Sequence, residues 1–338
     1  MSSPETMKAI VCEAPGSPST LVEHQVTVPS PAIGQALIKI LGFGLNRGGK
    51  QSTLYNVYLL CQGHMALPQI LGIECYGTIA GYNEAETAQR PPVGSRVFTC
   101  MGGLGREIPG SYAEYTCASI GNLREVPTTT LTVAQLSALP EMLQATWGAL
   151  TTGLDVQPGD RVLIRGATSS IGLCAIQLAR KLGATYVAAT TRNAGRKELL
   201  SQVGADKVII DDGKISQSLQ LDEKFDRVME LIGTPTINDS IVCARDKGTV
   251  CVVGNQSGGS WILENFSPFF IGLPNRVRLC AYGGGPQDLH TVPLEELIKD
   301  VEQGKLRLSI KVFGLDRIQE AHGFMEAGGG GSKMVVVL

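Results

Sequence analysis

Residues 161–183 read RVLIRGATSSIGLCAIQLARKLG, which is a short apolar run, a turn of small residues and a longer amphipathic segment. The run at 161–165 has the length and the β-branched content of a buried strand. In the segment that follows, apolar residues recur at helical spacing, at Ile171, Ala175, Leu178, Ala179 and Leu182. Gly183 stands where such a helix would end. The pattern therefore predicts a strand, a turn and a helix in succession.

The turn at 166–172 resembles an anion-binding turn. Its backbone N–H groups and the helix N-terminus would face an anion, which is how dinucleotide-binding folds hold a pyrophosphate. Of the glycines in the usual six-residue pattern only Gly172 is present, with Ala167 and Ser169 at the earlier positions. Small residues still permit the tight turn, and serine adds a hydroxyl that can donate to phosphate. We therefore expect the cofactor to be bound by Ala167, Thr168, Ser169, Ser170, Ile171 and Gly172, with an ordinary strand-to-helix turn as the alternative.

The next predicted strand, at 186–190, is followed by a short basic segment. Sites selective for NAD place an Asp or Glu at this strand end to accept from the ribose 2′-OH, and the sequence has none there. Arg192 and Arg196 would instead contact a 2′-phosphate, with Thr191 and Asn193 able to hydrogen-bond to it. The sequence thus favours NADPH/NADP+ as cofactor. A solvated basic helix start is the alternative for part of this set.

Further strands are predicted on both sides of this region. Apolar runs alternate with helical segments and predict a doubly wound parallel sheet, with strands at 161–165, 186–190, 207–210, 225–230, 249–253 and 278–282. Before residue 126, short runs bracketed by Gly and Pro predict a barrel-like unit, with strands at 7–11, 35–41, 77–81, 94–100 and 110–116. We expect helices at 132–139 and 141–151, with Thr130 or Thr132 as N-cap, and terminal strands at 310–313 and 334–338. The chain is therefore an α/β protein, which we divide into residues 1–126 with 288–338 and residues 127–287.

Composition narrows the class of protein. The 338 residues are 43% hydrophobic and 18% charged with a net charge of −2, which indicates a globular chain and disfavours nucleic acid or an anionic membrane as partner. The sequence shows neither a membrane-spanning segment nor a sorting signal at its start, so we expect a cytoplasmic protein. Nine scattered cysteines indicate reduced thiols, and His24, His290 and His322 read as surface or boundary residues.

The motifs together resemble a zinc-free medium-chain dehydrogenase/reductase of the quinone oxidoreductase or enoyl reductase type. The resemblance is carried by residues 7–10, 45–47, 68–74, 110–115, 157–164, 204–209 and 254–258, in the expected order. It implies a GroES-like, β-rich catalytic domain formed by both chain ends and a Rossmann cofactor domain between them. It also implies that Asn46 lies near the nicotinamide ribose and that the cofactor is lined by Thr146, Gly254, Asn255 and Phe270.

The zinc ligands of related enzymes are missing from this sequence. Gly44 and Ile73 stand where zinc-dependent relatives carry Cys and His, and the closely spaced cysteines of a structural zinc lobe are missing too. We therefore expect no metal. A constellation of His64 and Glu74 with Cys75 or Cys100 is the alternative.

Without a Lewis acid, the acceptor of the hydride must already be activated by conjugation. We expect an NADPH-dependent reductase of an enone, enoyl thioester or quinone. The alternatives are a zinc-free carbonyl reductase or alcohol dehydrogenase, and a non-catalytic NADPH-binding protein. Some relatives carry a tyrosine near the position of Gln51, so the catalytic candidates are Asn46, Tyr55 and Lys50, and the proton donor stays open. The edge strand at 278–282 favours a homodimer.

Overall fold

The computed structural model describes residues 4–46, 67–87, 89–258, 260–263, 266 and 276–338. The chain divides into two compact units, one made of Met1–Gln144 with Gly284–Leu338 and the other of Ala145–Gly283. Tyr55, Lys50 and Phe270, three of the predicted site residues, lie outside the described residues.

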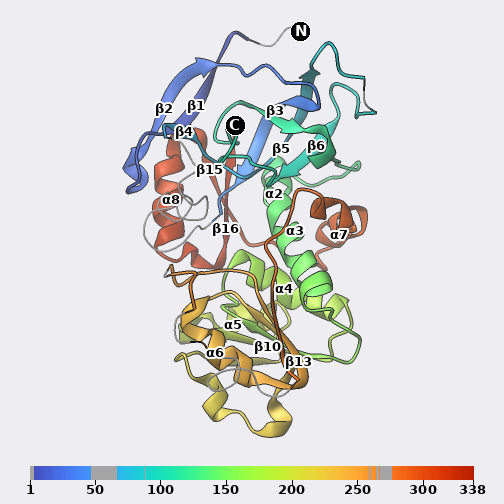
Figure 1. Ribbon diagram of the computed structural model, residues 1–338, viewed down its shortest axis with the longest axis vertical. Coiled ribbons are helices and arrows are strands. Elements are labelled where there is room, and N and C mark those ends of the chain that lie inside the picture. The colour runs from blue at the N-terminus through green and yellow to red at the C-terminus, as the bar shows by residue number, and fades with distance from the viewer. Residues whose placement is uncertain (1–3, 47–66, 88, 259, 264–265, 267–275) are drawn as a thin grey trace. The chain divides into compact units, whose positions relative to one another are not determined.

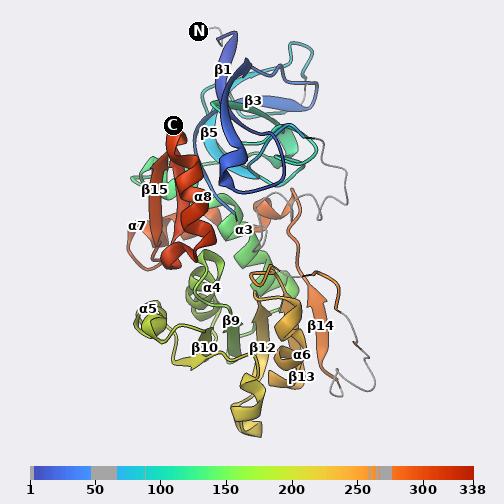
Figure 2. The ribbon, with the colours of Figure 1, turned by 90° about the vertical axis from the view of Figure 1, so that its left-hand side faces the viewer.

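The second unit is built on a six-stranded parallel sheet. Its strands are β9 (Arg161–Arg165), β10 (Tyr186–Thr191), β11 (Lys207–Ile210), β12 (Phe225–Glu230), β13 (Ala244–Val252) and β14 (Arg278–Ala281). They lie in the order β11-β10-β9-β12-β13-β14, and Figure 2 labels β10, β9, β12, β13 and β14 along the sheet. The direction of the chain across the sheet reverses between β9 and β12, which is where doubly wound sheets bind ligands. The predicted parallel sheet is confirmed.

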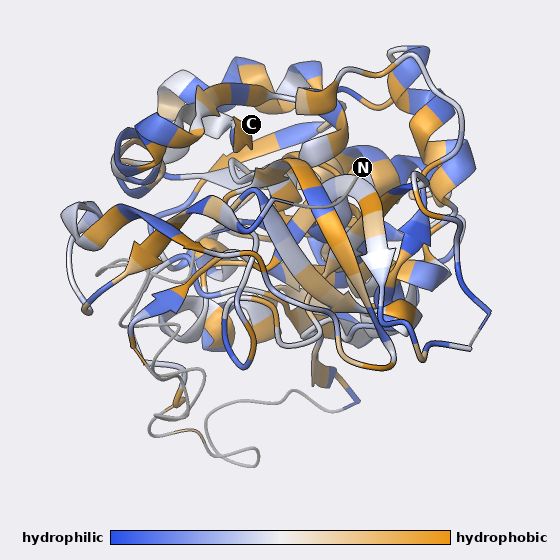
Figure 3. Ribbon diagram, turned by 90° about the horizontal axis from the view of Figure 1, so that it is seen from above, coloured by the Kyte–Doolittle hydropathy of each residue, from blue (hydrophilic) through white to orange (hydrophobic). Residues whose placement is uncertain are grey.

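Helices α4 (Ser170–Lys181), α5 (Lys197–Gln202) and α6 (Thr234–Cys243) accompany this sheet. One face of α4 is buried and contacts β9 and β10. A core cluster of the sheet includes Leu163, Val228, Val250 and Ile241, all at most 1% exposed. Hydropathy colouring shows apolar and polar residues alternating on the same helical ribbons, as expected for amphipathic helices (Figure 3).

The first unit contains two sheets. One has the order β2 (Leu21–Thr27), β1 (Thr6–Cys12), β4 (Gln69–Ile70). The other has the order β15 (Ile310–Gly314), β16 (Lys333–Val337), β3 (Gln35–Gly44), β5 (Glu74–Tyr82), β6 (Arg96–Cys100), β8 (Arg124–Glu125), with β7 (Tyr115–Ser119) also paired to β3. The C-terminal strands thus join the N-terminal sheet (Figure 1). Of the strand predicted at 110–116 only the end is regular, because the backbone of Gly110 and Tyr112 bonds instead to Ile70 and Leu71.

Helices α2 (Val133–Ser137), α3 (Pro140–Gly148), α7 (Leu294–Glu302) and α8 (Ile318–Glu326) complete the described elements of this unit. Thr132 begins α2 in a capping box with Gln135, as one of the two predicted caps. Because α2 contacts β3, β5 and β16, residues that we grouped with 127–287 pack in the first unit. The division between the units falls inside α3, after Gln144.

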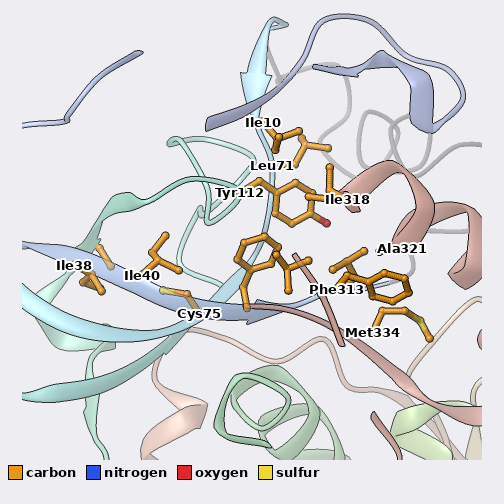
Figure 4. Packing of buried hydrophobic residues seen from close by; sticks show 14 of the residues in the cluster. Ile10, Ile38, Ile40, Leu71, Cys75, Tyr112, Phe313, Ile318, Ala321 and Met334 are labelled. Atoms are coloured by element: carbon orange, nitrogen blue, oxygen red, sulfur yellow. The ribbon is translucent and has the colours of Figure 1, made fainter. Parts of the chain in front are cut away.

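The core of the first unit surrounds Phe43 and Tyr112, whose rings stack with centroids 4.9 Å apart. Figure 4 shows Tyr112 beside Leu71 and Ile318 in this core. His322 on α8 also belongs to this core, at 0% exposed, with its Nε2 3.0 Å from the Tyr112 hydroxyl. The expectation of a surface or boundary histidine was therefore wrong, because the polar partner, Tyr112, lies in a distant segment that the local sequence does not show. Burial lowers the pKa of His322 to about 4.

No helix in the described ranges is long and apolar enough to cross a membrane. The eight described cysteines are all free thiols, six of them buried and two, Cys117 and Cys280, half-buried.

Candidate active site

The turn after β9 is fixed by hydrogen bonds to the neighbouring strand. Gly166 has a φ of 80°, which favours glycine, and its N–H donates to Thr190 Oγ1 at 3.0 Å. The next residue, Ala167, donates its N–H to the Thr190 carbonyl at 3.1 Å. A Cβ on Gly172 would lie 2.6 Å from the Ala167 Cα, so only glycine lets α4 approach the turn this closely.

The N-terminus of α4 is capped by Ser169. Its hydroxyl accepts from the Gly172 N–H at 3.1 Å and donates to the Gly166 carbonyl at 3.3 Å, so the oxygen expected to meet phosphate serves here as the helix cap. The N–H groups of Ser170 and Ile171 have no hydrogen-bond partner among the described residues. Together with the helix dipole, these N–H groups give the start of α4 the chemistry that suits an anion.

The segment after β10 folds into a local turn. Asn193 donates its N–H to Thr191 Oγ1 at 3.1 Å, and its side chain accepts from the Gly195 N–H at 2.9 Å. These contacts start the short helix at Ala194–Arg196. Arg192 projects from the turn and is exposed. The turn therefore presents a cation at the carboxyl end of β10.

A buried ion cluster lies beneath these turns. The Arg165 guanidinium is 0% exposed and donates through Nε and Nη2 to the two Asp211 oxygens, both at 2.9 Å. Its Nη1 donates to Asp239 Oδ2 at 2.7 Å and to Ser240 Oγ at 3.0 Å. We call Arg165, Asp211, Asp239 and Ser240, together with Thr190, the Arg165 cluster.

Asp211 is the buried one of the two aspartates that follow β11, next to β10, and its oxygens are fully engaged. Besides Arg165, they accept from Thr190 Oγ1 at 3.1 Å and from the Gly213 N–H at 2.9 Å. Burial alone would raise the pKa of Asp211, but the hydrogen bonds and charge of Arg165 outweigh it and hold the pKa below its usual value. The carboxylate is therefore ionised and committed within the protein.

Two further predicted residues follow β13. A Cβ on Gly254 would lie 3.2 Å from the Leu231 carbonyl oxygen. Asn255 is 8% exposed, and its Oδ1 accepts a hydrogen bond from Ser257 Oγ at 2.6 Å. A Cβ on Gly233 would be 2.4 Å from Asn255 Oδ1, so this loop packs tightly on the one after β12. The structure thus brings the turns after β9, β10 and β13 to one edge of the sheet.

Thr146 is fully buried in the part of α3 that belongs to the second unit. Its hydroxyl is buried and has no hydrogen-bond partner in the part of the chain that the structure describes.

Asn46 belongs to the first unit, where its side chain forms part of a second buried ion cluster. The Lys333 ammonium is 2.8 Å from Glu74 Oε1, 2.5 Å from Asn46 Oδ1 and 3.3 Å from Glu141 Oε2. Asn46 Nδ2 in turn donates to Glu74 Oε1 at 2.8 Å, and the Glu141 N–H donates to Glu74 Oε2 at 2.8 Å. We call Lys333, Glu74, Glu141 and Asn46 the Lys333 cluster.

Charge and space in the Lys333 cluster are tightly matched. Burial alone would lower the pKa of Lys333, but Glu74 and Glu141 reverse the effect and raise it. Burial raises the pKa of Glu141, with Lys333 opposing. A Cβ on Gly44 would lie 2.4 Å from Glu74 Oε1 and 2.5 Å from Lys333 Cε, so no larger residue fits there. The carboxamide of Asn46 is therefore fixed in orientation from both of its ends.

The donor atoms of the alternative metal site are otherwise engaged. Glu74 is paired with Lys333, and Cys100 donates to Gln144 Oε1 at 3.2 Å. Cys75 is fully buried, and burial raises its pKa. Within the described ranges no three His, Cys, Asp or Glu side chains are grouped to hold a metal ion. His64 lies outside those ranges.

Comparison with known proteins places the chain in a family. Residues 32–128 match the model of the alcohol dehydrogenase GroES-like domain, and residues 170–297 match that of the zinc-binding dehydrogenases. The chain is 28% identical to the acryloyl-coenzyme A reductase of Metallosphaera sedula over 74% of its length and 77% of that protein. It is also 28% identical to the quinone oxidoreductase of Pongo abelii, over 74% of both chains. The chain belongs to the medium-chain dehydrogenase/reductase family.

Other members and solved structures agree with this placement. The medium-chain dehydrogenase/reductase described here is 26% identical to the 2-methylene-furan-3-one reductase of Solanum lycopersicum over 99% of its length and 80% of that protein. Its fold matches AibC with a TM-score of 0.80, at 23% identity, covering 98% of this chain and 96% of the other. It also matches the quinone oxidoreductase from Coxiella burnetii with a TM-score of 0.77, at 23% identity, over 98% and 99% of the two chains. The expected fold and family are thus confirmed.

Both ion clusters of this medium-chain dehydrogenase/reductase escaped the sequence analysis. Arg165 directly follows the apolar residues 162–164 of β9, and Lys333 directly precedes the apolar residues 334–337 of β16. A charged residue within or beside such a run must find a buried partner, which is the signal that was available. The sequence does not show which residues are these partners, because the partners come from distant segments.

Proposed function

We propose that the protein is an NADPH-dependent reductase that transfers hydride to a conjugated acceptor such as an enone, enoyl thioester or quinone, without zinc. One observation carries the cofactor choice. At the carboxyl end of β10 the nearby carboxylate, Asp211, has its oxygens occupied by Arg165, Thr190 and Gly213, whereas the guanidinium of Arg192 is exposed. No acidic residue directly follows β10, where Arg192 and Asn193 stand, so a ribose 2′-OH would find no carboxylate at the end of this strand, and a 2′-phosphate would find a cation.

The residues after β9 and β10 have the chemistry to hold such a cofactor. The free N–H groups at the start of α4 suit the pyrophosphate, and Arg192 with Arg196 suits the 2′-phosphate. The close packing at Gly172 keeps the helix end near the strand, which leaves backbone rather than side chain facing the anion. The nicotinamide cofactor supplies the hydride when it is bound.

The acceptor class is supported by the relatives. Those compared above are named as reductases of acryloyl-coenzyme A, a quinone and a methylene-furanone, all of which are conjugated acceptors. Such acceptors need orientation and hydrogen bonds at oxygen more than a Lewis acid. Asn46 Nδ2 carries two N–H groups, of which Glu74 takes one, and we assign the other to the ligand. In the Lys333 cluster the ammonium already occupies the Glu74 carboxylate that a metal would need.

The roles of the two units and the oligomeric state are part of the same proposal. We propose that the unit formed by both chain ends is the catalytic domain and that the unit between them is the cofactor domain, with the division after Gln144 in place of the expected boundary at residue 126. We also propose a cytoplasmic homodimer in which β14, at the edge of its sheet, pairs with its copy. A solution mass twice the chain mass of 35.8 kDa is expected, and a mass equal to one chain would contradict the dimer.

The proposed function is tested by binding and turnover with matched variants. The wild type is titrated with NADPH and NADH, and NADPH oxidation is followed with a small quinone, an enone and a plain ketone, each with and without a chelator. Arg192→Ala should weaken NADPH binding by about 10-fold or more, the loss of one charge-assisted contact, and leave NADH binding unchanged. Lys207→Ala is the control, because this exposed lysine is the first residue of β11. It therefore lies at the amino ends of the parallel strands, whereas Arg192 lies at their carboxyl ends.

Each outcome separates the candidate functions. Chelator-resistant turnover of the quinone and the enone with NADPH supports the proposal. Chelator-sensitive ketone reduction would overturn the zinc-free assignment, and turnover of the ketone alone would point to a carbonyl reductase. Tight NADPH binding without turnover of any acceptor would indicate a non-catalytic protein.

A further inference from the structure

Three polar side chains form a row on one face of the parallel sheet, in its last three strands. In the register of these strands Arg227 of β12 lies opposite Thr249 of β13, and Thr249 lies opposite Arg278 of β14. Residues that are paired in this way project from the same face of a sheet. Because Arg227 is also opposite Val162, the second residue of β9, the row lies towards the amino ends of the strands. The turns after β9 and β10 lie at the carboxyl ends.

The face with this row carries an open hollow of about 500 Å³, which all three residues line. The rest of its wall comes from residues 153–155, in the segment between α3 and β9, and from Leu279 and Cys280 of β14. All of these residues belong to the second unit, so the hollow is formed within one unit of the chain.

The donor groups of the row have few partners. Thr249 is only 6% exposed, yet its hydroxyl makes no hydrogen bond to any residue that the structure describes. The Arg227 side chain is 14% exposed and its Nε lies 3.0 Å from Asp160 Oδ2, but its two terminal nitrogens donate to no described residue. Arg278 is exposed and has neither a hydrogen bond nor an ion pair within the described ranges. A buried hydroxyl and two guanidinium groups are thus available to a ligand in the hollow.

The charges and donors around the hollow limit the kind of ligand that fits. Guanidinium groups only donate hydrogen bonds, so a ligand between the two arginines must supply acceptor atoms. Asp160 balances the charge of Arg227, and the exposed carboxylate of Asp155 in the wall opposes an anion. The Asp155 Oδ1 accepts a hydrogen bond from Gln157 Nε2 at 2.7 Å. An anion held here must therefore gain from several directed hydrogen bonds rather than from net charge.

The spacing of the row favours a tetrahedral anion. Neighbouring strands are about 4.8 Å apart, so the Cα atoms of Arg227 and Arg278 lie about 10 Å apart with Thr249 between them. The two long side chains can reach a common point above the threonine hydroxyl. A ligand at that point accepts hydrogen bonds from two sides and from below. A tetrahedral oxyanion has oxygens for all three directions, whereas a planar carboxylate has only two oxygens.

We propose that the hollow is a binding site for a phosphate-type oxyanion, either free phosphate or the phosphate group of a small molecule. Arg227 and Arg278 donate to oxygens on opposite sides of the anion, and the Thr249 hydroxyl donates from the floor. Pairing of β14 with a second copy uses backbone groups in the plane of the sheet, whereas these side chains project from its face. The inference does not depend on the proposed reductase function, because the cofactor turns lie at the other end of the strands.

The test is calorimetric titration of the full chain with inorganic phosphate and, separately, with glycerol 3-phosphate, at pH 7.5 and constant ionic strength. Both should bind, and the tighter of the two identifies the source of the phosphate group. Acetate should bind about 10-fold more weakly or worse, because it lacks an oxygen for the third donor. Absence of binding by both phosphates, or equally tight binding of acetate, would overturn the proposal.

A matched pair of arginine variants places the binding in the hollow. Arg278→Ala should weaken phosphate binding by about 10-fold or more, the loss of one charge-assisted contact. Arg276→Ala is the control, because this arginine is exposed, pairs with Asp246 and does not line the hollow. Equal losses in the two variants would show an effect of overall charge and contradict the site.

Two further variants should change the affinity in opposite directions. Thr249→Val removes the hydroxyl at nearly constant volume and should weaken phosphate binding by about 5-fold. Its melting temperature should stay close to that of the wild type, because the hydroxyl has no described partner to lose. Asp155→Asn removes the opposing charge and should strengthen binding by about 3-fold, and asparagine tolerates the φ of 50° at this position. Unchanged affinity in Thr249→Val, or no gain in Asp155→Asn, would refute the assigned geometry.

The turns after β9 and β10 offer a second place for phosphate, so Arg192→Ala is titrated as well. This variant should keep the phosphate affinity of the wild type. A loss in Arg192→Ala without a loss in Arg278→Ala would assign the bound phosphate to the proposed cofactor site and overturn the inference, while leaving the proposed function intact.

Discussion

The Arg165 cluster and the Lys333 cluster each stabilise a buried cation, but they do so with different sets of hydrogen bonds. Arg165 meets Asp211 through two parallel hydrogen bonds and uses its remaining donors on Asp239 and Ser240. Lys333 contacts three oxygens from three separate segments, one of which belongs to the neutral amide of Asn46. A planar fork suits a single carboxylate, whereas an ammonium is a point charge that can gather unlike groups.

The difference indicates what each cluster does. In the Arg165 cluster the Asp211 oxygens are saturated, so the cluster acts as a structural clamp beneath the turns after β9 and β10, and the Asp211 carboxylate is not free to bind a ligand. In the Lys333 cluster the cation orients a carboxamide that we assign to the ligand. Loss of the first should therefore appear mainly in stability, and loss of the second mainly in function.

The largest effect is expected for Arg165→Met. It leaves Asp211 and Asp239 without their buried counter-charge, which costs about 5 kcal/mol of unfolding free energy, the upper end for a broken buried pair. Urea denaturation followed by circular dichroism measures it. Arg165→Lys should recover only part of the loss because lysine lacks the fork, and full recovery would remove the distinction between the clusters.

A smaller loss of stability is expected for Lys333→Met, about 3 kcal/mol, at the lower end of the same range. Glu74 keeps its hydrogen bonds from Asn46 and from the Glu141 backbone, and the Glu141 side chain is 14% exposed to water. Steady-state kinetics should show a fall in kcat/KM larger than that of Arg165→Met at a temperature where both variants are folded. The opposite ranking would show that the Lys333 cluster is structural only.

Thr190→Val sharpens the link between the Arg165 cluster and the glycine turn. The Thr190 hydroxyl accepts from the Gly166 N–H and donates to Asp211, so valine leaves a buried donor unsatisfied at nearly constant volume. The expected cost is about 1–3 kcal/mol of stability, with weaker NADPH binding in a fluorescence titration. Thr185→Val, at the amino end of β10, is the matched control. If both variants bind NADPH alike, the turn does not depend on Thr190.

The smallest effect is expected for Glu141→Gln, within about 1 kcal/mol at pH 7, because glutamine still accepts from Lys333. Burial raises the pKa of Glu141, so the folded state binds its proton more tightly than the unfolded state does. This contribution to stability is complete below pH 4.5, the ordinary value, and is lost as pH rises through the folded pKa. The variant should lack that decline, which denaturation curves measured from pH 4 to 8 would reveal. A decline of equal size in both proteins contradicts the assignment.

Much of the fold could be predicted because its elements have strong local signals. The run 161–165 and the helical pattern after it became β9 and α4, and Thr132 proved to be a cap. The strand predicted at 110–116 was mostly wrong because Gly110 and Tyr112 bond to a segment some forty residues earlier, which no local pattern shows. His322 was misjudged for the same reason.

In the candidate site too, the features with local sequence signals could be predicted and the contacts between distant segments could not. The turn residues from Ala167 to Gly172 could be predicted because a strand, a turn and a helix follow one another in the sequence. The contacts of Asp211 and of Asn46 could not, because each joins segments that meet only in the folded chain. The roles assigned to the predicted site residues stay predictions until the variants above are measured.

The hydrogen bond from the Gly166 amide to Thr190 makes this single proton a reporter on the second unit. Buried and bonded to a side chain that Asp211 holds in place, it should exchange with deuterium only when the turn opens. The outward-facing amides of β11, the strand at the other edge of this sheet, need no such opening and should exchange early. A ligand bound at the start of α4 would then slow exchange at Gly166 far more than at these amides of β11, which gives a readout of cofactor binding that needs no catalytic turnover.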